Sequence, residues 1–152
     1  MNKKKIFGLA LLALIGASFI AVPACVRNAF VKTNELNDKL EREWNFVLPD
    51  SARVIYDIHN RGWMGDGVEL FAVENGIQDE LPIEFSDVPD DGFEEEVDMR
   101  ISMFNADDPV DEQYLPDWER DYCWKLLNDE RDNTMYLWHY SDETLLYILI
   151  NY

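Results

Sequence analysis

The sequence predicts an α+β protein: an antiparallel sheet of about four strands with helices packed on one face, preceded by an N-terminal signal segment. Three observations support this fold class. Two pairs of strand-like segments are each joined by a turn, three segments have apolar residues at helical spacing, and the first residues include three lysines followed by a long uncharged, apolar run.

The N-terminal 24 residues have the layout of a signal peptide. Lys3, Lys4 and Lys5 precede a run of 17 uncharged residues, Ile6–Val22. As a helix this run would extend roughly 26 Å at about 1.5 Å per residue, which is short for a bilayer core of about 30 Å. We therefore expect residues 1–24 to be a signal peptide and residues 25–152 to form one acidic extracytoplasmic α+β domain.

The segment Val22-Pro23-Ala24-Cys25 resembles the lipobox of exported bacterial lipoproteins, although Pro23 departs from the usual pattern. The resemblance implies that Cys25 is lipidated and anchors the chain to the membrane. Ordinary cleavage with secretion and an uncleaved anchor are the alternatives, and all three place the rest of the chain outside the cytoplasmic membrane. If Cys25 stays unmodified, a disulfide with Cys123 is open to it.

Three segments are expected to be helical. Residues 26–44 carry apolar side chains at steps of about three or four, and residues 93–104 follow the capping sequence Asp90-Asp91-Gly92. In the second of these helices, acidic residues at 94–96 fall in the first turn, where the helix dipole favours negative charge. Residues 117–127 are the third expected helix.

Two hairpins are expected to form the sheet. Residues 53–59 (RVIYDIH) alternate and residues 68–74 (VELFAVE) return, joined by the glycine-rich loop Asn60–Gly67, whose glycines we expect to supply positive φ angles. Residues 134–140 and 145–152 form the second hairpin, with a four-residue loop. Because the second hairpin is apolar on both faces, it is expected at the centre of the sheet. The G-x-x-G-D-G turn at Gly62–Gly67 and the tyrosine-rich last strand resemble small secreted bacterial proteins of unknown function, which implies location and fold class.

The charge is strongly negative and unevenly distributed. The formal net charge is -18, and residues 25–152 alone hold 10 basic and 31 acidic residues. Residues 79–119 contain 16 acids and one base, Arg100. Repulsion from phosphates excludes nucleic acid as a direct ligand and disfavours anionic lipid surfaces, so membrane contact is expected only through the N-terminal lipid or signal segment.

The sequence offers several candidate sites. The partner-binding candidates are the loop residues and the acids before and within the second helix: Trp63, Asp66, Asp90, Asp91, Glu94, Glu95 and Glu96. Asp87, Asp91 and Asp98 partly imitate a calcium loop, but Pro89 occupies a ligand position, so only weak calcium binding is considered and no other cofactor is expected. His59, His139 and Cys123 lack the spacing of a zinc or thiolate site. The glycine-rich loop lacks the Lys and following helix of a phosphate-binding loop.

The leading functional hypothesis is a non-enzymatic, surface-exposed interaction module. Its acidic segment would bind a cationic protein or peptide, or a divalent cation. The first alternative is a small extracytoplasmic enzyme or saccharide-binding protein that uses Trp63 and a carboxylate pair. The second alternative is a structural envelope lipoprotein whose charge keeps it soluble.

Overall fold

A computed structural model describes residues 31–62, 66–77, 83–104 and 108–152 of the chain. Five strands form one antiparallel sheet in the order β1-β2-β5-β4-β3. The strands are β1 (Arg53–Arg61), β2 (Gly67–Glu74), β3 (Tyr122–Asn128), β4 (Thr134–Tyr140) and β5 (Leu146–Asn151). Residues 31–44 are helical, α2 spans Asp91–Ile101, and a short 3-10 turn, η1, spans Glu112–Tyr114.

Both predicted hairpins are confirmed. β1 pairs with β2, and His59 lies opposite Glu69 in that register. β4 pairs with β5, and β5 also pairs with β2, so the second hairpin lies in the interior of the sheet as expected. The sequence placed it there because it is apolar on both faces, and β5 is buried from Leu146 to Ile150.

Gly62 and Gly67 of the first hairpin are needed for space instead of unusual backbone angles, and Gly65 lies outside the described residues. Neither Gly62 nor Gly67 has a positive φ, contrary to expectation. A Cβ on Gly67 would collide with the backbone of Asn60 and Arg61, where β1 and β2 converge. A glycine is therefore required here because two backbones lie too close to leave room for a Cβ, and not because of a left-handed backbone conformation.

The helix predicted at 117–127 is wrong, because residues 122–128 form β3 along the edge of β4. The spacing of Trp118, Tyr122 and Leu126 suits a helix, but Tyr122, Trp124 and Leu126 also fit a strand with period two. Pairing with β4 places Trp124 opposite Trp138 and satisfies the backbone of β4, which would otherwise be an open edge. The sheet therefore has five strands where about four were expected.

α2 confirms the second predicted helix, with different limits. The Asp90 side chain accepts a hydrogen bond from the backbone N–H of Phe93 at 2.7 Å, and Asp91 and Glu94 lie in the first turn. Phe93 and Val97 are its buried residues. Ile101 is partly buried and packs against the same cluster, so the apolar stripe that faces the sheet consists of Phe93, Val97 and Ile101. Most of the remaining positions of α2 are acidic.

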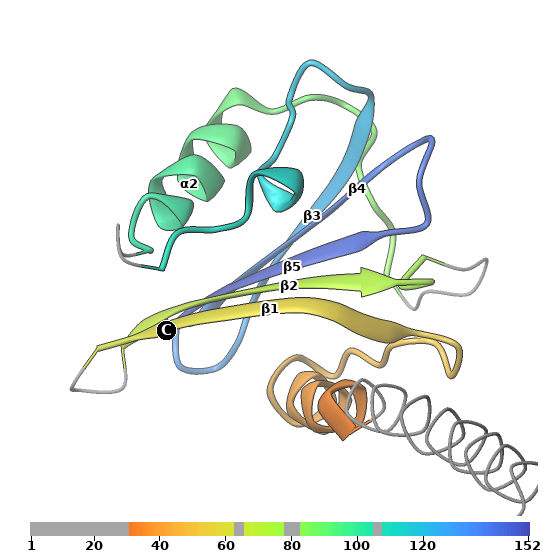
Figure 1. Cartoon of the computed structure of the whole chain (residues 1–152), viewed down its shortest axis with the longest axis vertical. Coiled ribbons are helices and arrows are strands. Elements are labelled where there is room, and N and C mark those ends of the chain that lie inside the picture. Colours follow the sequence, from red (N-terminus) through yellow and green to blue (C-terminus); the bar gives the residue numbers. More distant parts are fainter. Residues whose placement is uncertain (1–30, 63–65, 78–82, 105–107) are drawn as a thin grey trace, which may run out of the picture.

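Helices cover both faces of the sheet, which corrects the expectation of one covered face. In Figure 1, α2 and η1 lie on one side of the sheet and the helix at 31–44 lies on the other. Each side has its own buried cluster. The α2 side includes Phe93, Val97, Trp138 and Tyr147, and the other side includes Leu36, Leu40, Leu137 and Ile148. Since β2, β4 and β5 carry apolar residues on both faces, one layer of helices could not bury them all.

Among the residues that the structure describes, no helix has the length and apolar character needed to cross a membrane. The signal segment, Cys25 and Trp63 lie outside those residues. Their predicted roles stay predictions.

Candidate functional site

The predicted partner-binding residues fall into two groups. Asp90, Asp91 and the three glutamates at 94–96 gather at the start of α2. Asp66 lies apart, next to β2 in the loop of the first hairpin, where its carbonyl accepts a hydrogen bond from the N–H of Gly62 at 2.6 Å. The structure thus brings together the acids of α2 but does not join Asp66 to them by a described contact.

The acids of α2 belong to a larger surface, here called the acidic layer and defined as the described residues of 83–119. Its exposed acids are Glu84, Asp87, Asp90, Asp91, Glu95, Glu96, Asp98, Asp108, Asp111, Glu112, Asp117 and Glu119. Its base, Arg100, is engaged by Glu96 at 3.2 Å. Glu94 is half-buried and accepts a hydrogen bond from the Tyr122 hydroxyl at 2.5 Å. Most of these carboxylates therefore face solvent without a neighbouring cation.

Apolar side chains are exposed within the same layer. Val88, Met99, Met103 and Leu115 are 66%, 45%, 43% and 40% exposed. They make up half of the large exposed hydrophobic residues in the described part of the chain. Methionines on a surface adapt their shape to an apolar partner. The acidic layer therefore combines negative charge with deformable apolar contacts.

The weak calcium candidate gains no support from the geometry. Across the described ranges, no group of three or more His, Cys, Asp or Glu residues is arranged to hold a metal ion. Asp91 lies in the first turn of α2, and Asp98 instead accepts a hydrogen bond from the Trp118 indole N–H at 3.0 Å. Asp87, Asp91 and Asp98 thus do not converge on one point.

Cys123 and His139 are neighbours, because they lie opposite each other on β3 and β4. Burial and the charge of Asp87 raise the pKa of the Cys123 thiol, whereas burial lowers the pKa of His139. Both groups are therefore neutral at pH 7. His59 lies on β1 at the opposite edge of the sheet, so the three residues form no shared site.

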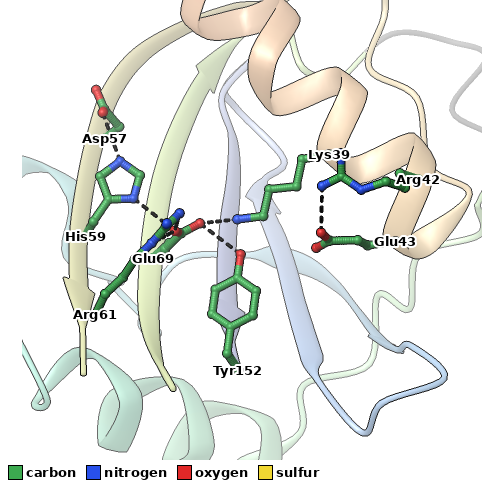
Figure 2. A network of polar contacts seen from close by, with 8 residues as sticks. All are labelled: Lys39, Arg42, Glu43, Asp57, His59, Arg61, Glu69 and Tyr152. Atoms are coloured by element: carbon green, nitrogen blue, oxygen red, sulfur yellow. Dashed lines mark hydrogen bonds and ion pairs between the residues drawn. The ribbon is translucent and has the colours of Figure 1, made fainter. Parts of the chain in front are cut away.

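The most organised polar cluster in the described structure was not predicted. It surrounds Glu69, which lies in β2 and is 0% exposed. Figure 2 shows its carboxylate contacted by Lys39, Arg61, His59 and Tyr152. The Arg61 Nε donates at 2.6 Å and the Tyr152 hydroxyl at 3.0 Å, while Lys39 forms an ion pair from the helix at 31–44. We call this cluster the Glu69 network.

Backbone geometry explains how these residues meet. Asp57, His59 and Arg61 are alternate residues of β1, so they share one face, and the register places Glu69 on β2 beside His59. Tyr152 follows β5, whose Ile150 pairs with Glu69. Lys32 and Lys39 are seven residues apart and therefore share the side of the helix that faces the strands. Three strands and one helix converge on one carboxylate.

The network fixes the charges of its members. Burial opposes ionisation of Glu69, but hydrogen bonds from His59 and Lys39 and the charge of Lys39 outweigh it, so the pKa of Glu69 falls to about 2. His59 contacts Glu69 through Nδ1 at 3.3 Å and Asp57 through Nε2 at 3.1 Å. The hydrogen bond to Glu69 is the largest cause that raises the pKa of His59, and the contact with Asp57 adds to it. An imidazole that donates from both nitrogens is the protonated form.

A pocket of about 280 Å³ opens beside the network, between the helix at 31–44 and the β1–β2 hairpin. Its lining consists of Lys32, Glu35, Leu36, Lys39, Arg42, Val54, Asp57, His59, Arg61, Glu69 and Phe71. The lining has no Ser, Thr or Cys to act as a nucleophile. Since Glu69 is held ionised at a pKa of about 2, it is also a poor general base. The pocket therefore combines fixed charged groups with an apolar wall.

Sequence reasoning missed this site because its candidates were the glycine-rich loop, the acids of residues 79–119, and the two histidines with Cys123, and Glu69 was not among them. One signal was present. Glu69 stands between Val68 and Leu70 in a strand that is apolar on both sides, and Asp57, His59 and Arg61 alternate in the partner strand. A carboxylate at such a position must find cations, because an unpaired buried charge costs several kcal/mol.

Comparison with known proteins adds no relative. No family model, curated protein or solved structure matched the chain. The fold class is therefore defined by the sheet and its two helical layers, and function has to be argued from the surfaces described above.

Proposed function

We propose that this protein is a non-enzymatic binding module, exported and either lipid-anchored through Cys25 or secreted, that uses the acidic layer to bind a cationic, partly apolar protein or peptide. The observation that carries the proposal is the coincidence, on one layer, of twelve exposed carboxylates and four exposed large apolar residues. Charge of one sign alone needs only solubility to explain it. Exposed methionines beside that charge have no such explanation.

Electrostatics and apolar contact would have separate roles. The uncompensated carboxylates would attract a cationic partner and raise its association rate, an effect that salt screens over about 8 Å at physiological ionic strength. Met99 and Leu115 would then supply the contact area that slows dissociation. A divalent cation would need converging ligands, which the described residues do not offer, so a basic protein or peptide is the better-supported partner.

The proposal can be tested with a tagged chain on cells and a lysine-reactive cross-linker, at low and high salt, with captured proteins identified by mass. We expect a basic partner that is captured at low salt and lost at high salt. The variant pair Glu95→Lys with Glu119→Lys reverses two exposed charges of the acidic layer and should abolish capture. The matched control, Glu41→Lys with Asp50→Lys, reverses two exposed charges outside that layer and should leave capture intact.

Two outcomes would contradict the proposal. If the two variant pairs capture equal amounts of the partner, the overall charge of the protein and not the acidic layer attracts it. An absence of any partner at either salt, with a normal phenotype for the Glu95→Lys and Glu119→Lys pair, would favour the structural envelope lipoprotein.

A second candidate function is favoured by the pocket beside the Glu69 network. An extracytoplasmic protein that binds a small molecule through Trp63 and a carboxylate pair requires a concave site near Trp63. Arg61, two residues before Trp63 in the chain, lines the pocket beside the Glu69 network, and so do Asp57 and Glu69. Because both carboxylates are already occupied by cations, this pocket supports binding better than hydrolysis.

A further inference from the structure

We propose that the pocket between the helix at 31–44 and the β1–β2 hairpin binds a small organic anion, whose carboxylate or phosphate group is held by Arg42, Arg61 and Lys32. This site is distinct from the part of the acidic layer formed by α2 and η1, which lies on the opposite side of the sheet (Figure 1). The ligand class follows from three features of the pocket: its charge, the arrangement of that charge, and its apolar wall.

The charge of the pocket is opposite to that of the protein. Its lining contains four Lys or Arg residues and three acids. The remainder of the described chain contains five Lys or Arg residues and 25 acids. Nearly half of the described basic residues have thus gathered around one small cavity. At physiological salt, acids farther away than about 8 Å are largely screened, so the local cations dominate the potential inside the pocket.

The two central acids of the pocket lie beneath its cations. Glu69 is fully buried and Asp57 is only 20% exposed at its side chain, whereas the side chains of Lys32, Arg42 and Arg61 are 51%, 67% and 64% exposed. Asp57 pairs with Lys32 and Glu69 pairs with Arg61 from below, whereas Arg42 pairs with its neighbour Glu43, and the outer edges of these bases stay open to solvent. Such support from a second layer of residues orients ligand-binding groups before the ligand arrives.

The guanidinium groups keep donors for a ligand. Arg61 contacts Glu69 through Nε and Nη2, and Arg42 contacts Glu43 through Nη2 at 2.8 Å. A guanidinium has five N–H donors in a planar fork, which fits a carboxylate or phosphate with two parallel hydrogen bonds. Those contacts with the described residues leave Nη1 of each arginine for an oxyanion.

The pocket wall is also apolar, with Leu36, Val54 and Phe71 in its lining. A simple inorganic anion makes no use of these side chains. The volume of about 280 Å³ is close to the lower end of the range of about 300–1,000 Å³ found for ligand pockets. The best match is a small acid with a compact apolar body.

Attachment of the helix to the sheet explains only part of this arrangement. An ion pair between Lys39 and Glu69 serves that purpose, and Lys39 is only 16% exposed at its side chain. The ion pair of Lys32 with Asp57 adds to that attachment, although the Lys32 side chain stays 51% exposed. Arg42, in contrast, pairs with its neighbour Glu43 and lies exposed at the rim of a cavity in a protein that is elsewhere short of bases. A structural attachment alone predicts no affinity for anions, which makes the two explanations separable.

The test is calorimetric titration of the purified full chain in low-chloride buffer at pH 6. The probes are benzoate, acetate and inorganic phosphate. We expect benzoate to bind with a Kd of about 1 mM, as suits a ligand of so few atoms, and to bind more tightly than acetate. Arg42→Gln and Arg61→Gln should each weaken benzoate about tenfold, the effect of one charge-assisted hydrogen bond.

Arg53→Gln is the matched control, because Arg53 is an exposed base at the other end of β1 that does not line the pocket. It should leave the affinity unchanged. Arg42→Gln keeps the test decisive if Arg61→Gln disturbs folding, since Arg42 contacts only its neighbour Glu43 among the described side chains. No heat with any probe, binding of phosphate alone, or equal losses in Arg42→Gln and Arg53→Gln would each overturn the proposal.

Discussion

Under α2 the sheet presents mainly aromatic side chains, whereas under the helix at 31–44 it presents mainly aliphatic side chains and one buried carboxylate. The two sides also attach their outer layers differently. On the α2 side, tyrosine hydroxyls at the edge of the core hydrogen-bond to the acidic layer, as Tyr122 does with Glu94 and Tyr140 with the N–H of Asp117. On the other side, ion pairs to Glu69 and Asp57 join the helix to the strands.

The difference shows where a protein with few basic residues places them. A tyrosine hydroxyl donates to a carboxylate without adding positive charge, so the acidic layer is attached and remains negative. The helix at 31–44 instead uses lysines, and the bases concentrated there leave a positively charged pocket. Stability on the α2 side should therefore depend little on pH at neutral and mildly acidic values, whereas the Glu69 network should make the other side sensitive to acid.

The largest effect is expected from Phe93→Ala. Phe93 is 3% exposed and its ring lies 4.7 Å from that of Trp124 and 5.9 Å from that of Tyr136. Loss of this side chain leaves a cavity between α2 and the sheet, and the free energy of unfolding should fall by about 3–5 kcal/mol. Urea unfolding at pH 7 and pH 5 should give the same loss. A loss that changed strongly between these two values would contradict an apolar attachment of α2.

A smaller effect, with a marked pH dependence, is expected from Lys39→Met. In this variant Glu69 keeps its hydrogen bonds from Arg61 and Tyr152. We therefore expect the free energy of unfolding at pH 7 to fall by roughly 2–3 kcal/mol, which is less than the roughly 3–5 kcal/mol typical when a buried charge loses its partner. The variant keeps an apolar side chain of similar length. Urea unfolding across pH 2–7 measures both the size of the loss and its dependence on pH.

The direction of that dependence follows from Glu69. Its pKa is about 2 in the folded protein, below the ordinary value of 4.5, so its contribution is present above pH 4.5 and is lost as the pH falls toward 2. The difference in free energy of unfolding between the wild-type protein and Lys39→Met should therefore become smaller as the pH falls from 4.5 toward 2. A difference that stays constant would show that Lys39 stabilises the fold through its contact with the Tyr152 ring and not through the charge of Glu69.

The smallest effect is expected from Tyr122→Phe. The hydroxyl donates to Glu94 and accepts a hydrogen bond from the N–H of Asp90 at 3.2 Å. Removing both contacts at the start of α2 should cost about 1 kcal/mol in urea unfolding. Tyr147→Phe is the matched control, because its hydroxyl makes no hydrogen bond within the described residues, and it should cost less. Equal losses would mean that the hydroxyl contacts do not stabilise the acidic layer.

The hairpins and α2 could be predicted because local signals specify them. Alternation, turn residues and the capping Asp90 act within a few residues, so the sequence alone indicates these elements. β3 was missed because Tyr122 and Leu126 fit both helical and strand periods, and only the unpaired edge of β4 decides between them. The concentration of acidic residues in the acidic layer could also be predicted, because it is read directly from the sequence of residues 79–119.

What the sequence determined by itself was the α+β class, the two hairpins, the cap of α2 and the excess of negative charge. The tertiary structure decided that both faces of the sheet are covered and that Glu69 is buried among Lys39, Arg61 and His59. The reason is physical: strand alternation and helical spacing each specify only which residues share a face. Which faces meet depends on the register and the order of strands that are far apart in the chain, and burial of apolar area across the whole sheet selects that order.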